Sequence, residues 1–226
     1  MICIIQARYS SKRLPGKVLK KILGITILKR VVNQVKKSKK ISKIVIATSN
    51  HKTDKKIVNF CNQNKINYIS GPLNNVFKRF YLTIARERCK SFVRISADSP
   101  LLDSTIINKA INLFNKNRYD IVTNVFPRTF PKGFSVEVIN SKIISDYLLK
   151  IKKRRHQEHL TSFFYDNYKK FKIKNFYNKI NCENINLSID NLNDFTKVKK
   201  IIKFCRNNNC SLDYILSIYK KLFNEK

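Results

Sequence analysis

Apolar residues in the first half of the chain alternate between short runs and helically spaced positions. Short apolar runs predict strands at residues 2–5, 43–48, 67–70, 91–96 and 120–123. Between them, apolar residues three or four apart predict helices at residues 27–37, 54–62, 75–90 and 103–115. Strands separated by helices of this length indicate an α/β fold, with a mostly parallel central sheet covered by helices on both faces.

The second half of the chain has a less regular pattern. It predicts strands at residues 135–139, 171–176 and 185–189, and helices at residues 140–151, 157–167, 193–207 and 211–223. No repeat and no Pro/Gly-rich linker divides the sequence. We therefore expect a single domain over residues 1–226, with a small inserted β-containing lobe around residues 126–180.

Net charge is the unusual feature of the composition. The formal charge is +33, from 47 Lys and Arg against 14 Asp and Glu. Such a charge is typical of a polyanion-binding or nucleic-acid-binding protein. However, the lysines are spread through every segment, and Ile, Lys and Asn are all heavily used. This pattern favours a solvated surface shaped by genome composition over a specific anion site.

The cysteines and the N-terminus indicate the compartment. None of the six cysteines forms a CxxC pair, and the three histidines show no metal-ligand spacing relative to them. Free thiols in a reducing compartment are the simplest account. The N-terminal apolar run is too short for a signal peptide, and no run is long enough to span a membrane. We expect a cytoplasmic protein.

The loop after the first predicted strand carries a dense group of cations. Residues 6–17 read QARYSSKRLPGK. A strand that ends in such a loop is a common way to hold a polyphosphate in an α/β fold. With only four glycines, the chain has neither a GxGxxG fingerprint nor a P-loop. Any phosphate must then be held by side chains, and Arg13 and Lys17 flank the Pro-Gly turn, whereas Lys12 reads as charged surface. An ordinary basic loop is the alternative.

Two aspartates follow predicted strands and face the same sheet edge as this loop. Asp98 comes directly after residues 91–96, and Asp190 directly after residues 185–189. Mg²⁺ prefers one or two carboxylates together with phosphate oxygens and water. The pair therefore predicts a Mg²⁺ site, against the alternative of helix caps or turn residues, which is how we interpret Asp103 and Asp194.

Ordered sequence blocks add a family resemblance. They are IIQARYSSKRLPGKVL, IATSN with Asp54, GPLNNVFKRFY, RISADSPLLD, YDIVTN, PKGFSVEV, EHLTSFFY and SIDNLNDF. Together they resemble CTP-dependent cytidylyltransferases that activate sugars. The chain looks most like the spore-coat polysaccharide biosynthesis branch of the acylneuraminate cytidylyltransferase family. The related 3-deoxy-manno-octulosonate cytidylyltransferases share the pattern of the first loop.

The resemblance implies a Rossmann-like nucleotidyltransferase fold and a reaction. CTP and a sugar, of an acidic nonulosonate type, would give CMP-sugar and pyrophosphate with Mg²⁺ as cofactor, in a homodimer. It also implies roles for residues of this chain. The catalytic residues would be Arg13, Lys17 and Asp98; the nucleotide-binding residues Ala7, Arg8, Arg13, Lys17, Gly71 and Arg94; the sugar-binding residues Glu137, His159 and Thr161; and the metal ligands Asp98 and Asp190.

The chain also departs from the family pattern near the implied sugar side. It has Asn74 and Asn75 where relatives usually show paired acids, Ser135 where they show Asp, and Asn186 where an arginine is common. Two alternatives to an active cytidylyltransferase therefore stand beside it. One is a catalytically degenerate relative that binds CTP, and the other is the polyanion-binding protein that the net charge indicates.

Overall fold

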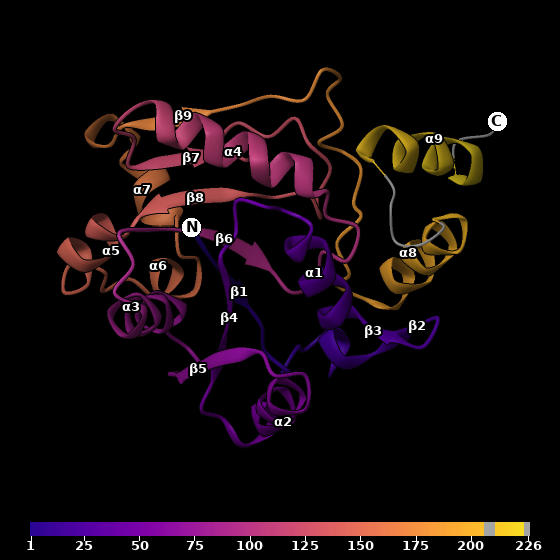
Figure 1. Ribbon diagram of the computed structural model, residues 1–226, viewed down its shortest axis with the longest axis horizontal. Coiled ribbons are helices and arrows are strands. Elements are labelled where there is room, and N and C mark those ends of the chain that lie inside the picture. Colours follow the sequence, from indigo (N-terminus) through magenta and orange to yellow (C-terminus); the bar gives the residue numbers. More distant parts are fainter. Residues whose placement is uncertain (206–210, 224–226) are drawn as a thin grey trace.

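The computed structural model describes residues 1–205 and 211–223. Its centre is a seven-stranded sheet with the order β5-β4-β1-β6-β8-β7-β9 (Figure 1). The strands are β1 (Ile2–Gln6), β4 (Lys43–Ser49), β5 (Asn67–Gly71), β6 (Ser91–Ser96), β7 (Ile121–Thr123), β8 (Glu137–Asn140) and β9 (Ile173–Asn175). Neighbouring strands are parallel except that β8 runs antiparallel to both β6 and β7. The expected mostly parallel sheet is confirmed.

Helices cover both faces of the sheet. Apolar side chains of α1 (Ile27–Lys36), α2 (Lys55–Gln63), α4 (Ser104–Lys116), α8 (Leu192–Phe204) and α9 (Leu212–Phe223) belong to one buried cluster. Those of α3 (Val76–Glu87), α5 (Ser141–Tyr147) and α7 (Ser162–Asp166) belong to a second, and α6 (Arg154–Glu158) lies beside α3. In β1, Cys3 and Ile5 face the first cluster and Ile4 faces the second. A central parallel strand that is buried on both sides reads as such a continuous apolar run.

The order of the strands creates a topological switch point at the carboxyl edge of the sheet. From β1 the chain moves outward to β4 and β5, and then crosses back to form β6 on the other side of β1. The connections that leave β1 and β6 therefore diverge. Ligands of open α/β sheets bind at such a switch point. The first loop follows β1, and Asp98 follows β6, so both lie at this switch point.

The structure differs from the sequence-based expectation at the short elements of the chain. A small hairpin, β2 (Lys21–Ile22) and β3 (Ile25–Thr26), was not expected. Its turn residues Leu23 and Gly24 both have positive φ, as two-residue hairpin turns require. Two-residue strands give no measurable period in the sequence.

Two expectations for the second half need correction. The single helix at residues 157–167 is divided into α6 and α7. Residues 185–189 form no strand, and only an isolated bridge joins Lys132 to Asn186. Residues 126–180, where we expect a small inserted β-containing lobe, contribute β8 and β9 to the central sheet. The end of the helix predicted at residues 193–207 lies outside the described residues.

The cysteines differ in state. Cys3, Cys61, Cys89 and Cys182 are free thiols, as expected, whereas Cys205 is disulfide-bonded and Cys210 lies outside the described residues. Burial raises the pKa of Cys61 to about 12, so this thiol stays protonated and unreactive at neutral pH. Among the helices of the described part of the chain, none has the length and apolar character needed to cross a membrane.

Candidate active site

Lys17 lies at the centre of the candidate site. It begins the 3-10 helix η1 (Lys17–Leu19), directly after the first loop. Its ammonium donates hydrogen bonds to Asp98 Oδ2 at 2.9 Å, Asp190 Oδ1 at 2.9 Å and the Ile189 carbonyl at 2.6 Å. The loop after β1, the loop after β6 and the segment before α8 therefore meet at one nitrogen atom. The sequence predicted that these residues share a sheet edge, and the structure brings them into direct contact.

The electrostatics of this cluster favour the charged forms of Lys17 and Asp190. Burial alone lowers the pKa of Lys17, but the charges and hydrogen bonds of Asp98 and Asp190 outweigh it, so the pKa lies above its ordinary value. Burial raises the pKa of Asp190, but Lys17, Arg13 and Lys132 more than offset this and lower it below its ordinary value. An ammonium between two carboxylates stabilises the ionised form of each partner.

Arg13 occupies the rim of the cluster. Its Nη2 lies 3.2 Å from Asp190 Oδ1, and 67% of its side chain is exposed. A guanidinium has five N–H donors, and one contact with a carboxylate leaves others to face solvent. Arg13 can therefore reach a polyphosphate at the switch point without leaving its aspartate, whereas Lys17 is buried and must turn away from its carboxylates to do so.

The first loop has a closed conformation. The Tyr9 carbonyl accepts hydrogen bonds from the backbone N–H groups of Ser11 and Gly16, both at 2.9 Å. Gly16 has φ +67°, and a Cβ at this position would lie 2.7 Å from the Tyr9 ring. Only glycine fits here, because another residue would be both strained and in collision. The Pro-Gly turn thus returns the chain to the base of the loop and places Lys17.

Asp54 fastens this loop to the sheet. Its carboxylate is fully buried and accepts from Tyr9 N at 2.6 Å, Ser49 N at 3.1 Å and Thr48 Oγ1 at 3.3 Å. Asp54 also stands at the N-cap of α2, but it makes no capping hydrogen bond. Its positioning role was missed from the sequence, where it was quoted only within a resemblance block.

A second polar cluster lies on the face of the sheet covered by α3 and α7. Arg94 of β6 faces Glu137 of β8 across the antiparallel ladder and forms an ion pair with it. Its guanidinium also donates to Gln6 Oε1 at 3.0 and 3.1 Å and to Thr161 Oγ1 at 3.3 Å. Arg94, Glu137 and Thr161, which the resemblance assigned to the nucleotide and the sugar, are therefore one connected group.

Tyr165 extends this second cluster and was not anticipated. Its hydroxyl donates to Glu137, and its oxygen can accept from the Thr123 hydroxyl, which lies 2.9 Å away. Burial raises its pKa well above the ordinary value, and the charge of Glu137 raises it further, so the phenol remains a proton donor at neutral pH. In the sequence Tyr165 looks like a core aromatic residue. Its polar role depends on contact with Glu137, which only the fold shows.

The remaining implied site residues are placed less closely. Ala7 is buried and continues the pairing of β1 with β4 through its N–H, while Arg8 is exposed beside it. Gly71 ends β5, where a Cβ would meet the side chain of Arg79 at 2.8 Å. His159 is exposed at the end of α6, and its ring makes no hydrogen bond within the described residues. The structure thus does not bring His159 into either cluster.

The departures from the family pattern have structural roles. Asn75 caps α3 by accepting from Lys78 N at 2.8 Å. Asn186 donates to Asp194 Oδ1 at 3.1 Å. Asp194 forms a capping box at the start of α8, and Asp103 caps α4, which confirms the capping interpretation of both aspartates. Asn74 is exposed.

The donor set at Lys17 fits Mg²⁺. Asp98 and Asp190 converge on the same nitrogen, so both carboxylates can also face one cation. The described residues contain no group of three or more His, Cys, Asp or Glu side chains that could hold a metal. Two carboxylates without further protein ligands match Mg²⁺, which takes its other oxygens from phosphate and water, rather than a structural Zn²⁺ site.

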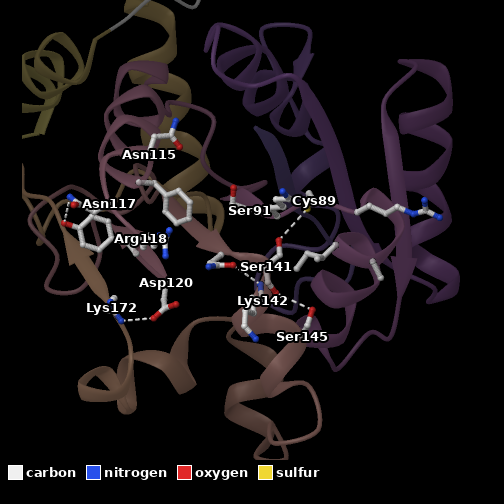
Figure 2. A pocket seen from close by; sticks show the side chains of 17 residues that line it. Cys89, Ser91, Asn115, Asn117, Arg118, Asp120, Ser141, Lys142, Ser145 and Lys172 are labelled. Atoms are coloured by element: carbon white, nitrogen blue, oxygen red, sulfur yellow. Dashed lines mark hydrogen bonds between the residues drawn. The ribbon is translucent and has the colours of Figure 1, made fainter.

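A large cavity lies at the opposite edge of the sheet. It has a volume of about 890 Å³ and is bordered by Arg118, Lys142 and Lys172, near the start of β6 (Figure 2). None of the residues that line it belongs to the candidate site. The size of this cavity therefore does not mark the candidate active site, which lies at the carboxyl edge.

A cation-rich loop that meets a carboxylate pair at the switch point of an open α/β sheet fits the class of nucleotide-binding enzymes. This class is narrowed by a match of the whole chain to one family model. The model, described as cytidylyltransferase, matches residues 2–225, and the chain belongs to this family.

The chain is also similar to individual proteins along most of its length. The chain is 35% identical over 199 residues to protein MJ1063 of Methanocaldococcus jannaschii, covering 86% of this chain and 80% of that protein. It is 26% identical over 210 residues to spore coat polysaccharide biosynthesis protein SpsF of Bacillus subtilis, covering 89% and 85%. The solved structure of a cytidylyltransferase from Leptospira borgpetersenii superposes with a TM-score of 0.93 at 26% identity, covering 97% of this chain and 93% of that one.

Proposed function

We propose that this cytidylyltransferase is Mg²⁺-dependent and couples CTP to an acidic, nonulosonate-type sugar, giving CMP-sugar and pyrophosphate for surface polysaccharide synthesis. The observation that carries the proposal is the contact of Lys17 with both Asp98 and Asp190 beside the first loop. The similarity to a spore coat polysaccharide biosynthesis protein supports the pathway.

The cluster of Arg13, Lys17, Asp98 and Asp190 would act mainly by position and charge. A sugar hydroxyl attacks the α-phosphorus of CTP, the bond to the β-phosphate oxygen breaks, and pyrophosphate leaves. Arg13, with its exposed donors, would stabilise the charge that develops on pyrophosphate. Mg²⁺ held by Asp98 and Asp190 would supply positive charge at the phosphates. Lys17 would then turn from these carboxylates towards phosphate oxygens.

An acidic sugar is supported by Arg128. Its guanidinium lies close enough to Glu137, Tyr165 and Glu183 for their charges to act on its pKa, which burial lowers. Within the described residues its hydrogen bonds go only to the Ser135 hydroxyl, at 3.1 and 3.2 Å. A cation whose nearest acceptor is a neutral serine can pair with a substrate carboxylate.

The resemblance implies a homodimer, and the cysteines and N-terminal segment lead us to expect a cytoplasmic protein. We propose that the enzyme is a cytoplasmic homodimer. Size-exclusion chromatography with light scattering measures the oligomeric state directly.

Pyrophosphate release tests the proposed reaction. Each of four nucleoside triphosphates is offered with a panel of neutral and acidic sugars, and release with CTP and an acidic sugar is expected. Asp98→Ala and Lys17→Ala should lose most turnover while circular dichroism stays native. Lys12→Ala, an exposed lysine of the same loop, is the matched control. Release at the wild-type rate from either variant would contradict the mechanism. CTP binding without release across the panel would favour the degenerate relative.

A further inference from the structure

Arg79 is a buried cation whose partner is not supplied by the described part of the chain. It lies on α3 and is only 3% exposed. Its Nε and Nη1 atoms are buried and make no hydrogen bond in that part. A buried charge without a partner costs several kcal/mol. A hydrophobic side chain at this position would stabilise the fold better than an unpaired cation. The presence of arginine therefore suggests a role other than stability.

The neighbours of Arg79 place its guanidinium at the candidate site. Helical side chains lean towards the helix N-terminus, which for α3 is the carboxyl edge of the sheet. The Arg79 stem crosses Gly71, where a Cβ would lie 2.8 Å from its Cγ. The charges of Asp54 and Arg8 both act on its pKa, which burial lowers to about 10. The guanidinium therefore lies between the end of β5, the end of β4 and the first loop.

Asp54 does not neutralise Arg79 by direct contact. No ion pair joins the two side chains, and the oxygens of Asp54 accept from Tyr9, Ser49 and Thr48 instead. Because no hydrogen bond holds Nε or Nη1, the guanidinium can turn towards a ligand without breaking one at either atom.

Arg79 and the Lys17 group lie on opposite sides of β1. Lys17 and its aspartates are found beside β1 and β6, whereas Arg79 lies beside β4 and β5, on the other side of β1. A nucleotide whose phosphates lie at Lys17 has its base several ångströms away, further along the carboxyl edge of the sheet. The cluster on the β8 side, around Arg94 and Glu137, is already internally paired. Arg128, also on the β8 side, is assigned above to the sugar, so Arg79 on the β4–β5 side is the buried cation left for the base.

We propose that Arg79 reads the nucleobase of the bound nucleotide and selects cytosine over uracil. This inference rests on the proposed use of CTP. Cytosine presents O2 and N3 as two adjacent acceptors, and uracil carries a hydrogen on N3. A guanidinium with two parallel N–H groups matches such an acceptor pair in the way that arginine pairs with the acceptor edge of guanine. Uracil would oppose its N3–H to one of these donors.

Equilibrium binding of CTP and UTP, measured by calorimetry in Mg²⁺ without sugar, tests the assignment. Arg79→Met keeps the length of the side chain and removes the donors. It should weaken CTP binding about 10- to 100-fold, the range of one bidentate arginine–base pair, and leave UTP binding nearly unchanged. Arg86→Met is the matched control, because Arg86 is exposed on the same helix. Thermal denaturation should show that Arg79→Met is at least as stable as wild type, since a buried unpaired charge is removed.

Each outcome separates the two proposals. An unchanged preference for CTP over UTP in Arg79→Met overturns the base-reading role and leaves the proposed function intact. An equal loss of CTP and UTP affinity also overturns it, because a phosphate-binding or water-bonded arginine would give that result. A wild-type protein that binds neither nucleotide, or shows no preference between them, contradicts the proposed function itself.

Discussion

Replacement of Asp54 by asparagine tests whether the first loop depends on its link to the sheet. The substitution keeps the size of the side chain and removes one acceptor. Asp54 Oδ2 serves Thr48 and Ser49, and Oδ1 serves Tyr9 N. If the asparagine keeps its oxygen towards Thr48 and Ser49, which donate more hydrogen bonds, its NH₂ group must face the Tyr9 N–H. The loop contact is therefore the one that is lost.

The cost follows from the contacts that Asp54 makes. A hydrogen bond to a charged group contributes about 1.5–3 kcal/mol, and an unsatisfied buried N–H costs a similar amount. We expect Asp54→Asn to lower the free energy of unfolding by about 2–3 kcal/mol. For a chain of this size that corresponds to a fall in Tm of about 4–12 °C. Affinity for CTP should fall as well, since the loop that carries Arg13 and Lys17 is no longer anchored.

Thermal denaturation and CTP calorimetry measure the two effects together. Asp146→Asn is the control, because Asp146 is exposed and its pair with Lys142 is a surface i,i+4 ion pair. It should change Tm by no more than about 2 °C. If Asp54→Asn matched this control in both assays, Asp54 would not position the loop. A fall in Tm with unchanged CTP affinity would show that the residue supports the fold alone.

Further predictions concern the cluster, the turn and the sugar side. The lowered pKa of Asp190 contributes stability that is complete above its ordinary value of 3.8 and is lost as pH falls below it, while the raised pKa of Lys17 contributes stability that is lost as pH rises above 10.5. Tm measured against pH should fall at both ends, and Lys17→Met should flatten both falls. Gly16→Ala should weaken CTP binding and lower stability by about 1–3 kcal/mol, because φ +67° and the Tyr9 ring oppose a Cβ; a CTP affinity equal to wild type would show that the turn tolerates it. Arg128→Gln should raise KM for an acidic sugar at least tenfold and leave KM for CTP unchanged, and an unchanged KM for the sugar would remove Arg128 from recognition.

The first half of the fold could be predicted because its elements are long and strongly patterned. The strand at residues 91–96 and the helix capped by Asp103 agree with the structure within one residue. The errors lie where local pattern and tertiary pairing disagree. Residues 185–189 alternate like a strand, but they are held by one bridge and by a hydrogen bond from Ile189 N to Asp98 O. Whether an extended segment finds a ladder is decided by distant residues, which the local sequence does not contain.

The site was predictable to the extent that strand ends share an edge. That rule brings Lys17 and Asp98 together. Asp190 reaches the same edge although residues 185–189 form no strand, because Ile189 N donates to Asp98 O. The rule does not show that Lys17 binds the two carboxylates directly. Asp54 and Arg79 could not be assigned from the sequence, because a buried polar residue on a helix looks like a cap or a solvated position until its surroundings are known.

The cluster of Arg13, Lys17, Asp98 and Asp190 has two positive and two negative charges. Within a chain of net charge +33, the reaction centre itself is close to neutral. The long-range attraction of a nucleoside triphosphate must then come from the surrounding lysine-rich surface. Surface attraction of this kind is screened within about 10 Å at 0.1 M salt, whereas buried ion pairs are screened much less. Added salt should therefore slow the arrival of CTP and leave the chemical step almost unchanged, so that composition governs encounter and the paired cluster governs reaction.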